Sequence, residues 1–294
     1  MPPDCEPRGT GSAVSLPHLD FAARRVMLMV APNGARRTQQ DHPALPLSAA
    51  EIAAAAAALA AAGASVLHLH VRDDDGRHTL DVDAYREAIA AVRKAVGRRL
   101  VVQVTTEAVG RYRPDEQMNL VRELRPEAVS LALRELVPDV AYDSDVARFF
   151  GWVVTEGIWP QYILYDEDDV RRFDLLRKRG VFADERPHCL LVLGRYGENR
   201  QGDPRDLERL LAAADFTQFP WSACCFGQRE HEAALAACAA GGHVRLGFEN
   251  NLQLADGSTA GDNAELIAQF VAAIAGSPRR PATADEVREE LLSR

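Results

Sequence analysis

The sequence has no run of apolar residues close to the roughly 20 that a membrane-spanning helix needs. Its alanine-rich stretch at 49–62 has a helix pattern, and residues 1–23 contain no apolar signal-peptide core. We therefore expect a cytoplasmic protein with a partly disordered arm at 1–23. No linker or internal repeat divides the rest, so residues 24–294 are expected to form one domain.

Cysteine is scarce, and an excess of basic residues is missing. The five cysteines are Cys5, Cys189, Cys224, Cys225 and Cys238, an odd number without a CxxC pair. This argues against a disulfide framework, a zinc ribbon and a thioredoxin-like motif, and favours reduced thiols. The net charge of −9 argues against a nucleic-acid binder but leaves a pocket for an anionic substrate open.

Short β-branched runs alternate with helical patterns along the chain. The expected strands are 25–31, 65–71, 100–105, 128–133, 162–165, 189–193, 216–224 and 244–248. The expected helices are 47–62, 82–95, 114–123, 168–179, 204–214, 230–239, 263–275 and one within 139–156. Alternating strands and helices predict parallel strands. Because no GxGxxG follows the first strand, a single (β/α)8 TIM barrel is favoured over an open doubly wound sheet.

The tail at 278–294 is expected to be a loop and a short helix, with Thr283 as N-cap and Glu286 three residues on.

The segment HLHVRD at 68–73 is the first candidate site. Residues two apart in a strand share a face, so His68 and His70 project together while Leu69 takes the other face. Two imidazoles one pleat apart can bind a single ion, and Zn²⁺ suits imidazole. Taken alone, the pattern also fits two polar residues at a strand end.

The segment HVRLGFEN at 243–250 is the second. Leu246 and Phe248 would pack against helices, which leaves Arg245, Gly247 and Glu249 facing the barrel. An inward Arg and Glu form either a buried salt bridge or an anion-binding arginine beside a metal-binding carboxylate. Functional groups gather at the C-terminal ends of barrel strands. Two histidines and one glutamate would leave a fourth zinc position open, as catalysis requires.

Polar residues also end the third and fourth strands. Gln103, Thr105 and Glu107 share one face, and Ser130 lies between small residues on the next strand. The hydroxyls could bind a carboxylate, although threonine is also simply a good strand former.

Together these motifs resemble the β-keto acid cleavage enzymes. The resemblance rests on APNGA at 31–35, HLHVRD at 68–73, VQVTT at 102–106, RPEAVSL at 125–131, HVRLGFEN at 243–250 and PATADEVREEL at 281–291. It implies a (β/α)8 barrel, a homotetramer and one Zn²⁺ per subunit. It also implies that a β-keto acid reacts with acetyl-CoA to give acetoacetate and the CoA ester of the shortened acid. The best-known member acts on 3-keto-5-aminohexanoate.

The resemblance carries roles over by position. The implied metal ligands are His68, His70 and Glu249. Arg245 matches an active-site arginine. The candidates for substrate binding are Thr105, Ser130, Asn33 and Arg36. The metal would polarise a keto oxygen as a Lewis acid, and Arg245 could orient a carboxylate.

Several residues depart from the family pattern. Asn250 stands where many members carry an acidic residue that moves a proton, and an amide cannot be a general base. Glu107 is the candidate substitute, and Asp73 a second, although Asp73 also fits a loop-capping role. Arg36 and Arg37 replace an acidic position, which suggests a substrate with an anionic far end.

The pocket itself is also unusual for the family, since Ala132 replaces a frequent asparagine and Arg134 a small residue. Two alternatives to the acetyl-CoA reaction stay open. One is a zinc hydrolase or aldolase that does not use CoA, and the other is a non-catalytic barrel that binds a small acid.

Overall fold

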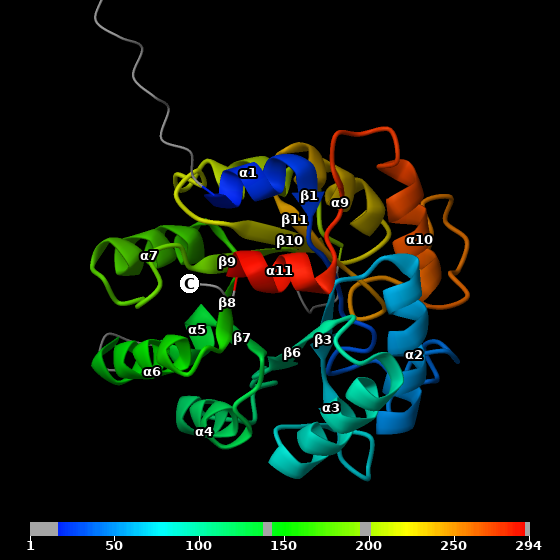
Figure 1. The fold of residues 1–294 in the computed structure, drawn as a ribbon, viewed down its shortest axis with the longest axis horizontal. Helices are drawn as coiled ribbons and strands as arrows, with labels where there is room; N and C mark the ends of the chain where they lie inside the picture. The colour runs from blue at the N-terminus through cyan, green and yellow to red at the C-terminus, as the bar shows by residue number, and fades with distance from the viewer. Residues whose placement is uncertain (1–16, 138–142, 195–200, 292–294) are drawn as a thin grey trace, which may run out of the picture.

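The computed structural model describes residues 17–137, 143–194 and 201–291 (Figure 1). In this part of the chain, eight parallel strands close into a barrel in the order β10-β11-β2-β3-β6-β7-β8-β9. They are β2 (Leu28–Val30), β3 (Val66–Leu69), β6 (Val101–Thr105), β7 (Ala128–Ala132), β8 (Trp159–Leu164), β9 (His188–Leu193), β10 (Trp221–Cys225) and β11 (His243–Leu246). The prediction of a (β/α)8 TIM barrel is confirmed.

Helices surround the barrel, and all but a short one at 133–136, which was not predicted, lie at nearly the expected positions. They are α2 (Ala49–Ala62), α3 (Val82–Val96), α4 (Pro114–Leu124), α5 (Leu133–Leu136), α6 (Asp143–Thr155), α7 (Glu167–Lys178), α8 (Asp206–Leu211), α9 (Glu230–Ala239) and α10 (Asn263–Ala273). None of the helices in the described residues is long and apolar enough to cross a membrane. Most of the predicted arm, 1–16, lies outside the described residues, and the unpredicted helix α1 (Pro17–Arg24) follows it.

Three strand predictions need correction. The fifth strand begins at Trp159 and not at 162. The seventh begins at Trp221 and not at 216, because Asp215 Oδ1 accepts a hydrogen bond from Thr217 N–H and fixes a turn there. The first predicted strand is divided: β1 (Arg25–Val26) pairs with β12 (Arg280–Pro281), and only β2 joins the barrel.

The N-terminal end of the barrel is closed by α11 (Ala284–Leu291), which crosses in front of the strands in Figure 1. Ala284 and Val287 of this helix pack in one buried cluster with inward residues of the strands, among them Trp159. As predicted, Thr283 caps the helix: its Oγ1 accepts from Glu286 N–H at 3.2 Å, and Glu286 Oε2 accepts from Thr283 N–H at 3.0 Å. The opposite, C-terminal end of the strands is left for a site.

Strand register sets which inward side chains meet near that end. His68 on β3 is paired with Gln103 on β6, and Thr105 on β6 with Ser130 on β7. A short antiparallel hairpin of β4 (Val71–Arg72) and β5 (His78–Thr79) follows β3. The polar residues singled out from the sequence are therefore brought to neighbouring strand ends.

Candidate metal centre and active site

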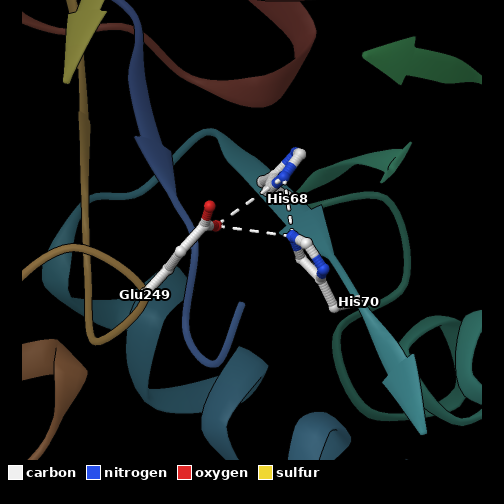
Figure 2. Close-up of side chains that lie close together, drawn as sticks. All are labelled: His68, His70 and Glu249. Carbon is white, nitrogen blue, oxygen red and sulfur yellow. Dashed lines mark hydrogen bonds and ion pairs between the residues drawn. The ribbon is translucent and has the colours of Figure 1, made fainter. Parts of the chain in front are cut away.

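Three side chains converge at the C-terminal end of the barrel, as Figure 2 shows. His68 Nε2 lies 3.1 Å from His70 Nε2, and Glu249 Oε2 lies 3.8 Å from the first nitrogen and 3.4 Å from the second. His68 lies in β3, His70 directly follows it, and Glu249 lies in the turn after β11. All three side chains are buried.

This set fits a zinc ion. In a tetrahedral site with bonds of about 2.0–2.1 Å, neighbouring ligand atoms lie roughly 3.3–3.4 Å apart. The three observed separations, 3.1, 3.4 and 3.8 Å, lie around that value. Two imidazoles and one carboxylate also leave a fourth position for a substrate oxygen.

The protonation states favour ligation as well. Burial, with Arg245 nearby, lowers the pKa of His68 to about 3, and burial also lowers the pKa of His70. Burial alone would raise the pKa of Glu249, but Arg245 and the two imidazoles hold it well below its usual range. The site therefore offers two neutral imidazoles and a carboxylate, the forms that bind a metal.

Arg245 orients the carboxylate of Glu249. Its Nη2 donates to Glu249 Oε1 at 3.3 Å, so the other oxygen of that carboxylate faces the imidazoles. The same Nη2 lies 3.3 Å from Cys224 Sγ. The salt bridge that the sequence suggested as an alternative to a metal site is thus present as a part of the candidate site.

The turn that carries Glu249 is held by buried groups. Gly247 directly follows β11 and has a φ of +136°, and a Cβ there would lie 2.4 Å from Ala31 O. Glu249 N–H donates to the same Ala31 oxygen at 3.1 Å. The buried Glu230 accepts from Gly247 N–H at 3.0 Å, and Asn263 Oδ1 accepts from Phe248 N–H at 2.8 Å. The predicted strand at 244–248 is therefore too long, because the backbone leaves the sheet at Gly247.

His68 and Glu249 of the metal-binding cluster line a small cavity. Thr105, Ser130, Glu107 and Arg245 all line it. Ser130 Oγ is buried and has no hydrogen-bond partner among the described residues, and Thr105 Oγ1 accepts from Glu107 N–H at 3.1 Å. Both hydroxyls can donate a hydrogen bond to an anionic group in the cavity.

Among the described residues, Glu107 is the one carboxyl that lines the cavity besides Glu249. Burial and the nearby Glu249 and Glu135 raise its pKa to about 8. Its Oε2 lies 3.9 Å from His70 Nδ1, and its backbone oxygen is bonded to His78 Nε2 at 3.0 Å. A carboxyl with a raised pKa beside a candidate metal site is suited to proton transfer.

Other predicted residues lie outside this lining. Asn250 faces Glu230, with its Nδ2 donating to Oε1 at 3.3 Å. Asn33 is buried and donates to Pro46 O and His70 O, which supports the loop below His70. Arg36 is exposed, and its charge lowers the pKa of Glu107, against the larger effect of burial.

Asp73, the second candidate base, has a structural role in the hairpin. Its Oδ1 accepts from Arg77 N–H at 2.8 Å and from Asp75 N–H at 3.1 Å, so it caps the β4–β5 turn.

Two residues near the site have contacts that the sequence analysis did not assign. Gln103 Oε1 lies 2.8 Å from His68 Nδ1, and Glu230 accepts from the turn that carries Glu249. The shared face of Gln103 with Thr105 was a usable signal, since it points Gln103 into the barrel beside His68. Glu230 gives no such signal, because it reads as an ordinary acidic residue in the first turn of α9.

Comparison with known proteins decides the family. Residues 25–292 match the sequence model of the beta-keto acid cleavage enzymes. The chain belongs to this family.

Two curated relatives cover nearly the whole chain. The 3-keto-5-aminohexanoate cleavage enzyme of Fusobacterium nucleatum is 29% identical over 272 residues, which cover 91% of this chain and 97% of the relative. The 3-oxoadipate:acetyl-CoA acetyltransferase of Cupriavidus necator is 28% identical over 276 residues, which cover 89% and 93%. Among solved structures, apo ObcA superposes with a TM-score of 0.67 at 18% identity, covering 85% of this chain and 65% of that one. This last likeness supports the fold alone.

Proposed function

We propose that this β-keto acid cleavage enzyme uses one Zn²⁺ per subunit to catalyse a retro-Claisen type transfer. A β-keto acid and acetyl-CoA would give acetoacetate and the CoA ester of the shortened acid. The bond between C2 and C3 of the keto acid and the bond between the acetyl carbon and sulfur of acetyl-CoA break. The acyl group of the keto acid becomes bonded to the CoA sulfur, and the acetyl group becomes bonded to C2. The observation that carries the proposal is the convergence of His68, His70 and Glu249 beside Arg245.

When bound, zinc would supply a Lewis acid that polarises the keto oxygen and stabilises negative charge next to it. The chain's own groups supply the rest. Thr105 and Ser130 donate hydrogen bonds that hold the substrate carboxylate in the cavity. Arg245 keeps Glu249 in its ligating orientation and adds positive charge where the negative charge develops.

Proton transfer is assigned to Glu107 in this proposal. The amide of Asn250 cannot accept the C2 proton, and it faces Glu230 instead of the cavity. Glu107 is a carboxyl on the cavity wall, 3.9 Å from His70. It is therefore placed to take a proton from a substrate that reaches the histidine cluster.

The first experiment measures bound zinc by elemental analysis in the wild type and in His70→Ala. About one zinc per chain is expected, and the variant is expected to lose it. His231→Ala is the matched control, because this half-buried histidine on α9 is bonded to Gln269 Nε2 and lies outside the cluster. Wild-type protein that takes up no zinc, or a control that loses as much as His70→Ala, would remove the ligand assignment.

The second experiment incubates the zinc-loaded protein with a β-keto acid and acetyl-CoA and follows acyl-CoA products by mass spectrometry. Formation of acetoacetate and a new CoA ester in equal amounts is expected. The substitution at Asn250 favours one alternative, a zinc hydrolase or aldolase that does not use CoA. Consumption of the keto acid at the same rate without acetyl-CoA would support that alternative. The homotetramer implied by the resemblance stays a prediction, to be tested by the mass in solution.

A further inference from the structure

One side of the active-site cavity is lined mainly by apolar side chains in the described residues, with Tyr165 packed beside them. Ala132 on β7, Ile163 on β8, Val192 on β9 and Phe226 after β10 line it there, and we call these four residues the apolar wall. They pack in one cluster and are between 2% and 9% exposed. The wall is therefore a built surface of the barrel interior.

Most of the apolar wall lies across the barrel from the candidate metal centre. In the closed order of eight strands, β9 stands opposite β3, which carries His68, and β7 stands opposite β11, which carries Arg245. Phe226 follows β10, the neighbour of β11. The charged groups in the lining, Glu107, Arg245 and Glu249, belong to the side of the histidines. A substrate bound at the centre through its carboxylate and keto group would direct its remaining acyl chain towards the wall.

Arg134 and Arg37 make hydrogen bonds outside the cavity lining. Arg134 donates to Asp169 at 2.5 Å and to Asp166 at 2.7 Å, and its guanidinium lies 4.6 Å from the ring centre of Tyr165. Arg37 donates to Asn250 O at 3.3 Å. Among the described residues, neither Arg36 nor Arg37 lines the cavity. Within the described part of the chain, the anionic far end of a substrate, suggested by these two arginines in the sequence, therefore has no cationic partner at the wall.

We propose that the substrate is a β-keto acid whose acyl group is short, aliphatic and uncharged. This inference rests on the proposed function and adds the substrate class to it. An ionised group pressed against the apolar wall would lose its hydration without gaining a partner. The cavity is small, which favours a short chain. The two curated relatives are named for substrates that carry an amino group or a second carboxylate at this end.

The test compares four keto acids with acetyl-CoA on the zinc-loaded wild-type protein: 3-oxopentanoate, 3-oxohexanoate, 3-oxoadipate and 3-keto-5-aminohexanoate. Acyl-CoA formation gives kcat/KM for each. The two aliphatic acids should exceed the two charged acids by at least about tenfold, because each buried methylene favours binding by about fourfold and a buried charge opposes it. Between the aliphatic acids, the longer should be favoured by about fourfold if the wall still has room.

Variants of the wall test its role directly. Ile163→Arg places a cation in the wall and should raise kcat/KM for 3-oxoadipate relative to 3-oxohexanoate by at least tenfold. Val192→Thr keeps the shape of the side chain and should lower the preference for aliphatic acids even if the arginine variant does not fold. Leu175→Arg is the control, because Leu175 is 47% exposed on α7, away from the cavity. It should leave all four values unchanged.

The outcomes separate this inference from the proposed function. If a charged keto acid is cleaved as well as the aliphatic acids, or better, the inference is overturned while the acetyl-CoA reaction stands. The same holds if neither wall variant changes the order of the substrates. If zinc-loaded protein converts none of the four acids with acetyl-CoA, the proposed function fails, and the substrate class falls with it.

Discussion

Gln103→Leu should weaken zinc binding without touching a ligand. Gln103 is fully buried, and its Oε1 lies 2.8 Å from His68 Nδ1. If Nδ1–H donates to this oxygen, Nε2 keeps its lone pair for the metal. Gln103 is fixed in turn, because its Nε2 donates to Gln161 Oε1 at 3.2 Å. Gln161 Nε2 lies 3.4 Å from Ser222 Oγ, which is 2.8 Å from His188 Nε2. A chain of buried polar groups therefore orients His68.

The size of the effect follows from this burial. Loss of such an outer partner usually lowers metal affinity by 10–100-fold. Since water has no access to replace Gln103, we expect the upper half of that range, roughly 30–100-fold, or about 2–2.7 kcal/mol. Leucine also leaves Gln161 Oε1 without its donor, which costs about 1–3 kcal/mol in the free energy of unfolding. Stability and zinc affinity must therefore be measured separately.

Competition with a chelator gives the zinc affinity, and thermal unfolding with excess chelator gives the stability of the metal-free protein. Gln117→Leu is the matched control. Gln117 is equally buried, but its Nε2 donates to Thr106 O and to Glu135 Oε2, neither of which is a candidate metal ligand. It should lose stability and keep zinc affinity. The reasoning is refuted if folded Gln103→Leu binds zinc within about threefold of the wild type, or if the control loses as much affinity.

Three further changes have defined outcomes. Glu107→Gln should retain zinc, measured by elemental analysis, while acyl-CoA formation falls by about 10²–10⁴-fold, the usual contribution of a general base. Gly247→Ala should lower both zinc content and melting temperature, since its Cβ would meet a backbone oxygen at 2.4 Å; Gly241→Ala, which also has positive φ but has nothing within 4 Å, should keep its zinc. Glu286→Gln should destabilise the protein at pH 7, because hydrogen bonding from Arg280 lowers the pKa of Glu286 from 4.5 to about 2. A depressed carboxyl pKa stabilises the fold above pH 4.5, and this contribution is lost as the pH falls towards 2, so denaturation curves of variant and wild type should converge there.

Strand periodicity accounts for what the sequence could predict of the site. His68 and His70 project from one face of a strand end, and this requires only the two-residue repeat. Thr105 and Ser130 follow the same rule on the next strands and do line the cavity. The barrel could also be predicted, because eight alternating units with a right-handed crossover have few ways to pack.

Glu249 was identified for a partly different reason from the one the structure gives. Periodicity extended the last strand to 248 and placed Glu249 on its inner face, whereas the strand ends at Leu246. The φ of +136° at Gly247 turns the backbone, and Ala31 O then receives the N–H of Glu249. Such a turn depends on a close approach to another strand, which no local pattern encodes.

Loops explain why the substrate end was predicted less well than the metal end. A strand side chain points to one of two faces, so the alternation along the strand predicts which residues lie beside it. A loop side chain takes its direction from contacts made after folding. Arg36 and Arg37 follow β2 in a loop, and the structure directs Arg37 to Asn250 and leaves Arg36 exposed. Ile163 and Val192 lie in strands, and their inward direction was available from the repeat alone. The strand residues of the cavity, and not the loop arginines, are therefore the better guide to which keto acid this protein accepts.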